Sequence, residues 1–348
     1  MTRFLINFLV TQKKYNFIIS LLYLYQQQAC KRMILNDDQQ KSLQRLLRKK
    51  NMQQLYQAYI KPFNSKPYPK KFLDIPYGKQ SMFQKMDIYL PENHPDPYPV
   101  IIYIHGGAWM LGGKRQGCMY SPLFFLQHGY AIIGANYRLS PLHKWPAHIH
   151  DIKAVVRYLK AHASEYRLDT NRIVLWGDSA GGHLVELMAL TDGIKELEDP
   201  TLGYMEYDTK VQAVISWFGI SNFAAFENES SALALAGKIL PNFLYKRFPY
   251  LMFKQNIFQD TKLVKQVSPI TYIEQADYAA PILLQHGTED FLVSPQQSIS
   301  FRNALIQKFG SSICELDQIE GAGHYSEEFV TTENMYRVRK FIEQHLQR

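Results

Sequence analysis

The sequence predicts an α/β fold in which a mostly parallel sheet is flanked by helices. Three observations lead to this class. Short apolar runs rich in Ile and Val are typical of strands buried on both faces. Turn residues close most of these runs, and residues 151–163 between two of them have helical periodicity. Strands that alternate with helices form parallel sheets. The runs are Val100–Ile104, Ala131–Ala135, Ile173–Trp176, Val211–Ser216 and Ile282–Gln285.

Two segments precede the α/β body. Residues 1–32 are interpreted as an extension or a weak signal-like segment, because neither of their apolar runs reaches the roughly 18–20 residues that span a bilayer. They also lack a small-x-small cleavage pattern. One hypothesis is that the working chain begins at Met33. Residues 33–70 combine an amphipathic helix, Asn36–Tyr59, with a proline-rich linker.

The body comprises residues 71–348. Apolar and polar side chains alternate over Lys85–Leu90, as on a half-buried strand. In Asp151–Ala163 the apolar residues recur every three or four positions, which predicts a helix. Residues 222–268 interrupt the alternation of strands and helices and are crowded with phenylalanine. We interpret them as a cap-like insertion and not as a separate domain.

Charge and cysteine content exclude several classes of function. The formal net charge is +8, but residues 1–50 hold ten Lys or Arg against two Asp, so the whole excess lies there. A balanced body predicts no nucleic-acid-binding face. The three cysteines, Cys30, Cys118 and Cys314, are too far apart to suggest a disulfide framework or a zinc site. We expect a cytoplasmic protein without membrane association; secretion or membrane attachment through residues 1–32 is the alternative, and a homodimer is left open.

A G-x-S-x-G motif, Gly177–Gly181, follows the apolar run Ile173–Trp176 and precedes a helix-like stretch. In that context the serine lies on a tight turn that lifts its hydroxyl above the sheet, and the flanking glycines leave room for the turn. The positive end of the following helix adds to this environment. The pattern therefore predicts that Ser179 is a nucleophile, in preference to an ordinary glycine-rich turn.

A second motif, His105–Trp109, comes directly after the run Val100–Ile104. Acyl transfer at a serine develops negative charge on the former carbonyl oxygen, and backbone N–H groups must already point there. We expect Gly106 and Gly107 to supply such donors from one side and Ala180 from the other.

These motifs resemble the α/β-hydrolase fold and, within it, the hormone-sensitive-lipase-like esterase branch. The Gly177–His183 string is most similar to acetyl-xylan and feruloyl-type carbohydrate esterases and to related prokaryotic esterases. The resemblance extends from about Lys71 to His345 and rests on four motifs in order. These are His105–Trp109, Ala135–Pro141, Trp145–Ala147 followed by Asp151, and Gly177–His183.

In this fold an acid and a histidine follow the serine. The resemblance assigns the acid to Asp290, with Glu289 as fallback, whereas Asp317 lies inside a strand-like segment. Among the eleven histidines, His324 is the best base because it lies in a glycine-rich loop after the final strand. His286 is interpreted as structural and His345 as solvated.

Other polar residues near the motifs are interpreted as structural. Asp178 orders neighbouring loops or caps the next helix, and Arg138 and Asp151 form a buried pair. With Asp151, the histidines His143, His148 and His150 resemble the family's structural loop before a helix more than a metal site.

The sequence therefore predicts a serine carboxylesterase that needs no metal and no cofactor and cleaves small acyl or aryl esters. An arylformamidase or amide hydrolase using the same residues is one alternative, and a non-catalytic binding protein on a hydrolase scaffold is another. The intact catalytic set argues against the latter. The predicted residues are Ser179, Asp290 and His324, with Gly106, Gly107 and Ala180 as the oxyanion hole.

Overall fold

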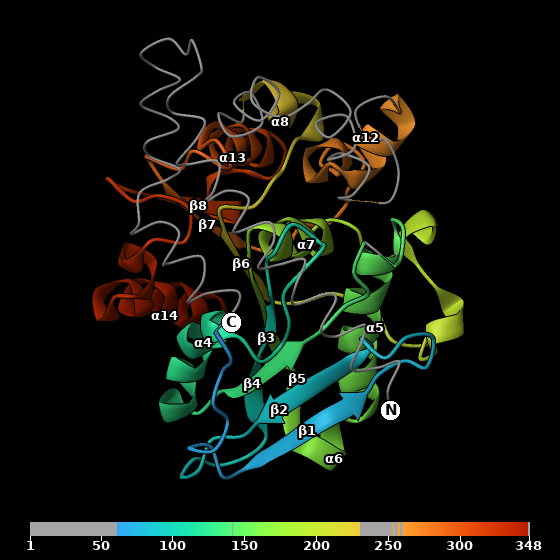
Figure 1. Ribbon diagram of the computed structural model, residues 1–348, viewed down its shortest axis with the longest axis vertical. Coiled ribbons are helices and arrows are strands. Elements are labelled where there is room, and N and C mark those ends of the chain that lie inside the picture. The colour runs from blue at the N-terminus through green and yellow to red at the C-terminus, as the bar shows by residue number, and fades with distance from the viewer. Residues whose placement is uncertain (1–60, 141, 230–252, 254–256, 258–259, 347–348) are drawn as a thin grey trace, which may run out of the picture. The chain divides into compact units, whose positions relative to one another are not determined.

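A computed structural model describes residues 61–140, 142–229, 253, 257 and 260–346 (Figure 1). Its sheet has the strand order β1-β2-β4-β3-β5-β6-β7-β8. β2 pairs antiparallel with both β1 and β4, and the remaining neighbours pair in parallel. The prediction of a mostly parallel sheet is confirmed. The strands are β1 Lys71–Pro76, β2 Lys85–Tyr89, β3 Tyr98–Ile104, β4 Ala131–Ala135, β5 Leu168–Asp178, β6 Ala213–Trp217, β7 Ile282–Gly287 and β8 Cys314–Ile319.

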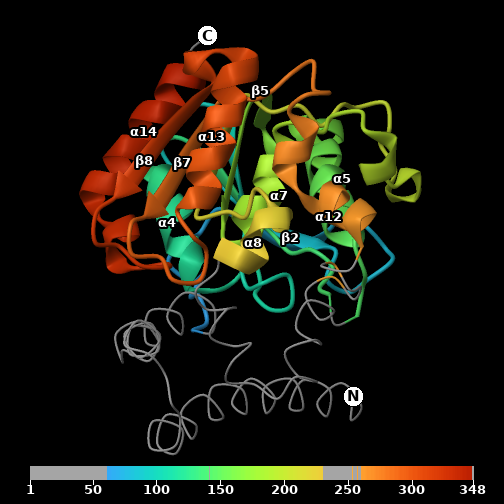
Figure 2. The ribbon, with the colours of Figure 1, turned by 90° about the horizontal axis from the view of Figure 1, so that it is seen from above.

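Helices cover both faces of the sheet (Figure 2). α4 and α14 pack on one face, and α5, α7 and α13 pack on the other, so the central strands are buried on both sides. The α-helices are α4 Tyr120–Leu123, α5 Ala147–Ala161, α6 Ala163–Tyr166, α7 Ala180–Met188, α8 Phe223–Glu229, α12 Thr261–Val267, α13 Gln296–Phe309 and α14 Thr332–Leu346. The 3-10 helices span residues 117–119, 124–128, 195–197, 200–202, 269–272, 311–313 and 327–330.

Two expectations about histidines were wrong. α5 begins at Ala147, four residues before the predicted start, so His148 and His150 lie in the helix and not in a loop before it. Pro146 precedes the helix, a position where its missing N–H costs little. His345 is also buried and not solvated, and its ring lies 4.6 Å from that of Phe341 on the same helix, α14.

The predicted helix Asn36–Tyr59 and residues 1–32 lie outside the described residues, as does the middle of the 222–268 insertion. The described end of the linker packs onto the body. Phe63 is buried, and its N–H donates to the Arg115 carbonyl at 3.1 Å. Among the described residues, no helix has the length and apolar character needed to cross a membrane.

Candidate active site

The Ser179 turn joins the end of β5 to the start of α7. Ser179 has φ 54° and ψ −116°, which is a conformation that L-residues seldom adopt. Its own N–H donates to the Trp217 carbonyl at 2.8 Å, so the neighbouring strand β6 supports the turn. The side chain is partly exposed at the N-terminal end of α7. The chain thus presents the hydroxyl above the carboxyl ends of the parallel strands.

Only glycine can occupy positions 177 and 181, because neighbouring backbone atoms leave no room for a β-carbon. A β-carbon built on Gly181 would lie 2.0 Å from the Ile104 carbonyl oxygen, and one on Gly177 would lie 2.3 Å from the Gly181 carbonyl oxygen. Any side chain at either position would force backbone to move. This close contact also brings the end of β3, and the His105–Trp109 loop that follows it, against the turn of Ser179.

The loop after β3 includes Gly106 and Gly107, the predicted oxyanion donors. Ile104 pairs in register with Gly177, so the loop begins beside the first residue of the Gly177–Gly181 motif. The third predicted donor, Ala180, is the first residue of α7. The structure therefore brings these three backbone segments to one edge of the sheet, around Ser179.

The loops after β7 and β8 bring Asp290 and His324 to the same edge. His324 Nε2 lies 3.1 Å from Ser179 Oγ, and His324 Nδ1 lies 2.7 Å from Asp290 Oδ2. A carboxylate accepts hydrogen bonds, so Nδ1 has the proton and Nε2 is left to accept from the serine hydroxyl. The ring of Phe218 packs against the imidazole with centroids 4.4 Å apart. Residues separated by 145 and 34 positions thus form one hydrogen-bonded chain.

Asp290 is buried but stays ionised. Its Oδ1 accepts from the N–H groups of Leu292 and Val293 at 2.9 and 3.0 Å. Burial by itself raises the pKa of Asp290, but the nearby His324 and His286 rings outweigh it and hold that pKa well below its ordinary value. The carboxylate is therefore able to orient His324 and to stabilise a positive imidazolium.

His286 and the two alternative acids occupy different environments. His286 is fully buried, with Nδ1 2.7 Å from Ser298 Oγ and Nε2 3.0 Å from the Val293 carbonyl oxygen. The same Nε2 lies 3.5 Å from Asp290 Oδ2, so this histidine also contacts the Asp290 carboxylate. Glu289 is exposed, and Asp317 on β8 accepts from Gln285 at 2.8 Å.

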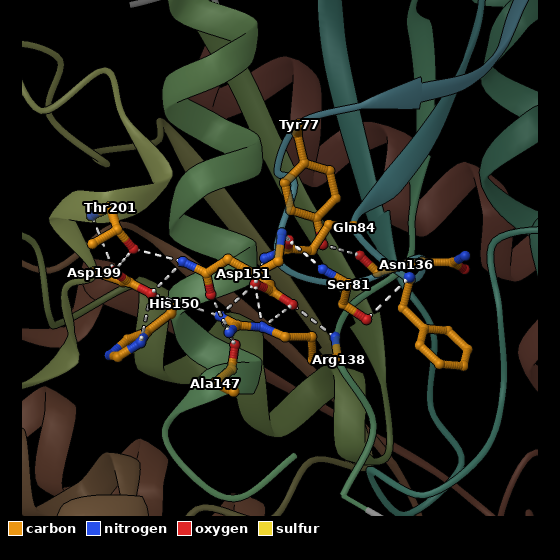
Figure 3. Close-up of polar contacts among 12 residues, drawn as sticks. Tyr77, Ser81, Gln84, Asn136, Arg138, Ala147, His150, Asp151, Asp199 and Thr201 are labelled. Atoms are coloured by element: carbon orange, nitrogen blue, oxygen red, sulfur yellow. Dashed lines mark hydrogen bonds and ion pairs between the residues drawn. The ribbon is translucent and has the colours of Figure 1, made fainter. Parts of the chain in front are cut away.

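The Arg138–Asp151 pair belongs to a separate buried network (Figure 3). Asp151 Oδ1 accepts from Arg138 Nε at 2.9 Å and from Gln84 Nε2 at 2.8 Å. Arg138 also donates to Gln80 Oε1 at 2.6 Å. Figure 3 shows this network linking the segment before β2, the loop after β4 and the start of α5. The predicted buried pair is present, and its hydrogen bonds hold these three segments together.

Two residues near the site, Asp178 and His183, form side-chain hydrogen bonds that the sequence does not predict. Asp178, which precedes Ser179, is buried and accepts a short hydrogen bond from the Tyr103 hydroxyl on β3. His183 on α7 bonds to Trp109 across 74 positions. Both residues lie in the motif Gly177–His183, but nothing in the sequence indicates which side chains they meet.

Across the described residues, no three His, Cys, Asp or Glu side chains are grouped as metal ligands would be. Cys118 and Cys314 are buried and free, and burial raises their thiol pKa values above the ordinary range.

Known proteins are similar to most of this chain. The family model BD-FAE matches residues 86–305. The probable carboxylic ester hydrolase LipM of Mycobacterium tuberculosis is 35% identical over 67% of this chain and 51% of its own length. Esterase LipQ of the same organism is 29% identical over 74% of this chain and 58% of its own. The chain therefore spans about half the length of these curated relatives.

A solved structure titled as a truncated form of a carbohydrate esterase from gut microbiota has a TM-score of 0.71 and 26% identity. The match takes in 83% of this chain and all of that one. The fold and the family follow from these similarities together.

Proposed function

The chain belongs to the BD-FAE family, and from this premise we propose that it is a serine carboxylic ester hydrolase. The main support is the hydrogen-bonded chain in which Asp290 meets His324 at 2.7 Å and His324 meets Ser179 at 3.1 Å. Nucleophile, base and orienting acid are the three groups that acyl transfer at a serine requires. The esterase names of the relatives LipM and LipQ agree with this chemistry.

In the proposed reaction, Ser179 Oγ attacks the ester carbonyl carbon while His324 Nε2 takes its proton. The amides of Gly106, Gly107 and Ala180 stabilise the negative oxygen of the tetrahedral intermediate. When the carbon–oxygen bond to the alcohol breaks, His324 returns the proton to the leaving oxygen. A water molecule, deprotonated by the same nitrogen, then attacks the acyl-enzyme and releases the acid and the free serine.

We propose neutral esters with small acyl or aryl groups as substrates. The charge of residues 51–348 is balanced, which suits an uncharged ester. Similarity to a protein titled carbohydrate esterase adds acetylated or aryl-esterified sugars to the substrates to be tested. A series from acetate to long-chain esters, with methyl ferulate and acetylated xylan, would define the acyl and alcohol preferences.

The direct test compares Ser179→Ala with the wild type on 4-nitrophenyl acetate. We expect kcat/KM to fall by at least about 10³-fold, because the nucleophile is lost. Ser300→Ala, which removes a hydroxyl on α13 that bonds to Gln296, is the control and should keep wild-type activity. Hydrolysis by a folded Ser179→Ala protein at the wild-type rate would remove the proposal.

A further inference from the structure

His183 lies one helical turn after Ser179 on α7. Its backbone N–H donates to the Ser179 carbonyl at 2.9 Å, and its side chain is completely buried. The proposed reaction uses no atom of this imidazole. A buried polar ring so close to the nucleophile needs partners, because an unpaired polar group away from water is costly.

Both nitrogens of the His183 ring have a partner. The indole N–H of Trp109 donates to Nδ1 at 3.1 Å, and Nε2 lies 2.6 Å from the Val267 carbonyl oxygen. An indole N–H can only donate and a carbonyl can only accept, so the ring is the neutral tautomer with its proton on Nε2. Burial lowers the pKa of His183 to about 3, which keeps it in this form.

Trp109 belongs to the loop that contains Gly106 and Gly107. Ala108 and Trp109 have φ values of 52° and 58°, in the left-handed region that residues other than glycine enter infrequently. Such a loop needs external support to keep one conformation. The buried indole supplies it through His183, and the Trp109 carbonyl accepts from the Ser140 N–H at 2.9 Å.

Val267 is the last residue of α12, at the end of the 222–268 insertion. The next residue, Ser268, accepts the N–H of Phe223 on its Oγ at 3.0 Å, so the two ends of the insertion meet there. The Phe223 ring also packs edge-on to His183, with centroids 5.3 Å apart. One imidazole therefore contacts the loop after β3 and both ends of the insertion.

We propose that His183 is a positioning residue, which ties the loop carrying Gly106 and Gly107 and the base of the 222–268 insertion to the helix that begins behind Ser179. It acts through Trp109 and touches no reacting atom. The inference rests on the proposed function, since the loop matters for catalysis only if its amides bind an oxyanion. Its consequence is that losing the bond to Trp109 lowers kcat more than it raises KM, because the oxyanion forms after substrate binds.

Three variants separate this role from simple packing. His183→Leu removes both hydrogen bonds at similar volume, and His183→Gln retains an acceptor and a donor. Trp109→Phe removes the indole N–H together with one buried ring, and its packing cost is measured by thermal unfolding. We measure kcat and KM on 4-nitrophenyl acetate, thermal unfolding, and hydrogen exchange of the Trp109 indole by ¹⁵N NMR, assigned with Trp109→Phe.

We expect His183→Leu and Trp109→Phe each to lower kcat about tenfold or more while KM changes less than about threefold. The double variant should lose clearly less kcat than the product of the two single losses, because both changes remove the same bond. His183→Gln should recover most of kcat, and the Trp109 indole should exchange slowly in the wild type and fast in His183→Leu. If His183→Leu does not fold, Trp109→Phe and His183→Gln decide the question.

A folded Trp109→Phe protein with kcat within twofold of wild type would overturn the inference. So would losses that multiply in the double variant, or a His183→Gln protein no better than His183→Leu. A wild type that hydrolyses no ester overturns the proposed function instead, and in that case the exchange of the Trp109 indole still reports whether His183 fixes the loop.

Discussion

The two halves of the proposed active site are built in different ways. The Ser179 turn is fixed by backbone packing, since Gly181 leaves no room for a β-carbon beside Ile104 and the Ser179 N–H bonds to β6. The loops of Asp290 and His324 also approach closely at one point, since a β-carbon on Gly287 would lie 2.2 Å from the Ala322 carbonyl oxygen. Their functional side chains, however, are placed by hydrogen bonds, such as that between His324 Nδ1 and Asp290 Oδ2 at 2.7 Å. We call the Ser179 turn the steric half, because an added β-carbon would collide with backbone there. We call the loops of Asp290 and His324 the polar half, because substituting their side chains should lower activity more than stability.

The largest effect is expected at the histidine that bridges the two halves. His324→Ala should lower kcat/KM for 4-nitrophenyl acetate on the order of 10⁴-fold, because it removes the proton acceptor of Ser179. The unfolding temperature should change by only a few degrees. A His324→Ala enzyme that retains a tenth of wild-type activity would show that another group acts as the base.

Asp290→Asn tests the polar half through both rate and pH. The amide cannot hold the same tautomer of His324, so kcat should fall on the order of 10³-fold. Because the folded-state pKa of Asp290 lies below its ordinary value, the carboxylate stabilises the fold above about pH 4, and this stabilisation disappears as the pH falls through the folded-state pKa.

Urea unfolding at several pH values checks the sign of this effect. The wild type should be more stable than Asp290→Asn by about 1–3 kcal/mol at pH 5, and the difference should be smaller at pH 3. A difference that grows on acidification would contradict the assignment of an ionised, stabilising Asp290.

A pair of glycine variants tests the steric half against the polar half. Gly181→Ala should cost about 1–3 kcal/mol or more of stability and lower kcat/KM at least about tenfold, because its β-carbon would lie 2.0 Å from the Ile104 oxygen. Gly323→Ala is the matched control beside His324, where the nearest atom lies 3.9 Å away. It should stay within about threefold of wild type. Equal losses in thermal melts and assays would refute the distinction.

The smallest effect is expected at His286, which also contacts Asp290. His286→Ala leaves the Ser298 hydroxyl and the Val293 carbonyl without this partner and should cost about 1–3 kcal/mol of stability. Its kcat should remain within about tenfold of wild type, since Asp290 keeps its two backbone donors. A loss as large as that of His324→Ala would mean that His286 takes part in the chemistry.

The steric half is also the one that sequence patterns describe best. The spacing of glycines around Ser179 reflects local backbone geometry, and the apolar runs match β3 to β7 because buried parallel strands need continuous apolar residues. The order Ser, Asp, His could be predicted because the fold constrains which strand each loop follows.

Contacts that depend on side-chain direction could not be predicted. The bond between Trp109 and His183 joins the loop after β3 to helix α7 across 74 positions and depends on the rotamers of both rings. The burial of His345 follows from the packing of α14 against the sheet, which its charged and apolar neighbours alone do not fix. α5 begins at Ala147, and His148 in its first turn has its Nε2 2.8 Å from the Ser140 hydroxyl, a contact that the apolar periodicity of residues 151–163 does not indicate.

Ser179 is proposed to be an activated nucleophile, and covalent labelling tests this most directly. A fluorophosphonate probe followed by peptide mass spectrometry should find one adduct on Ser179, absent in Ser179→Ala and formed far more slowly in His324→Ala. An adduct on a different serine, or no adduct on a folded protein that hydrolyses esters, would contradict the account.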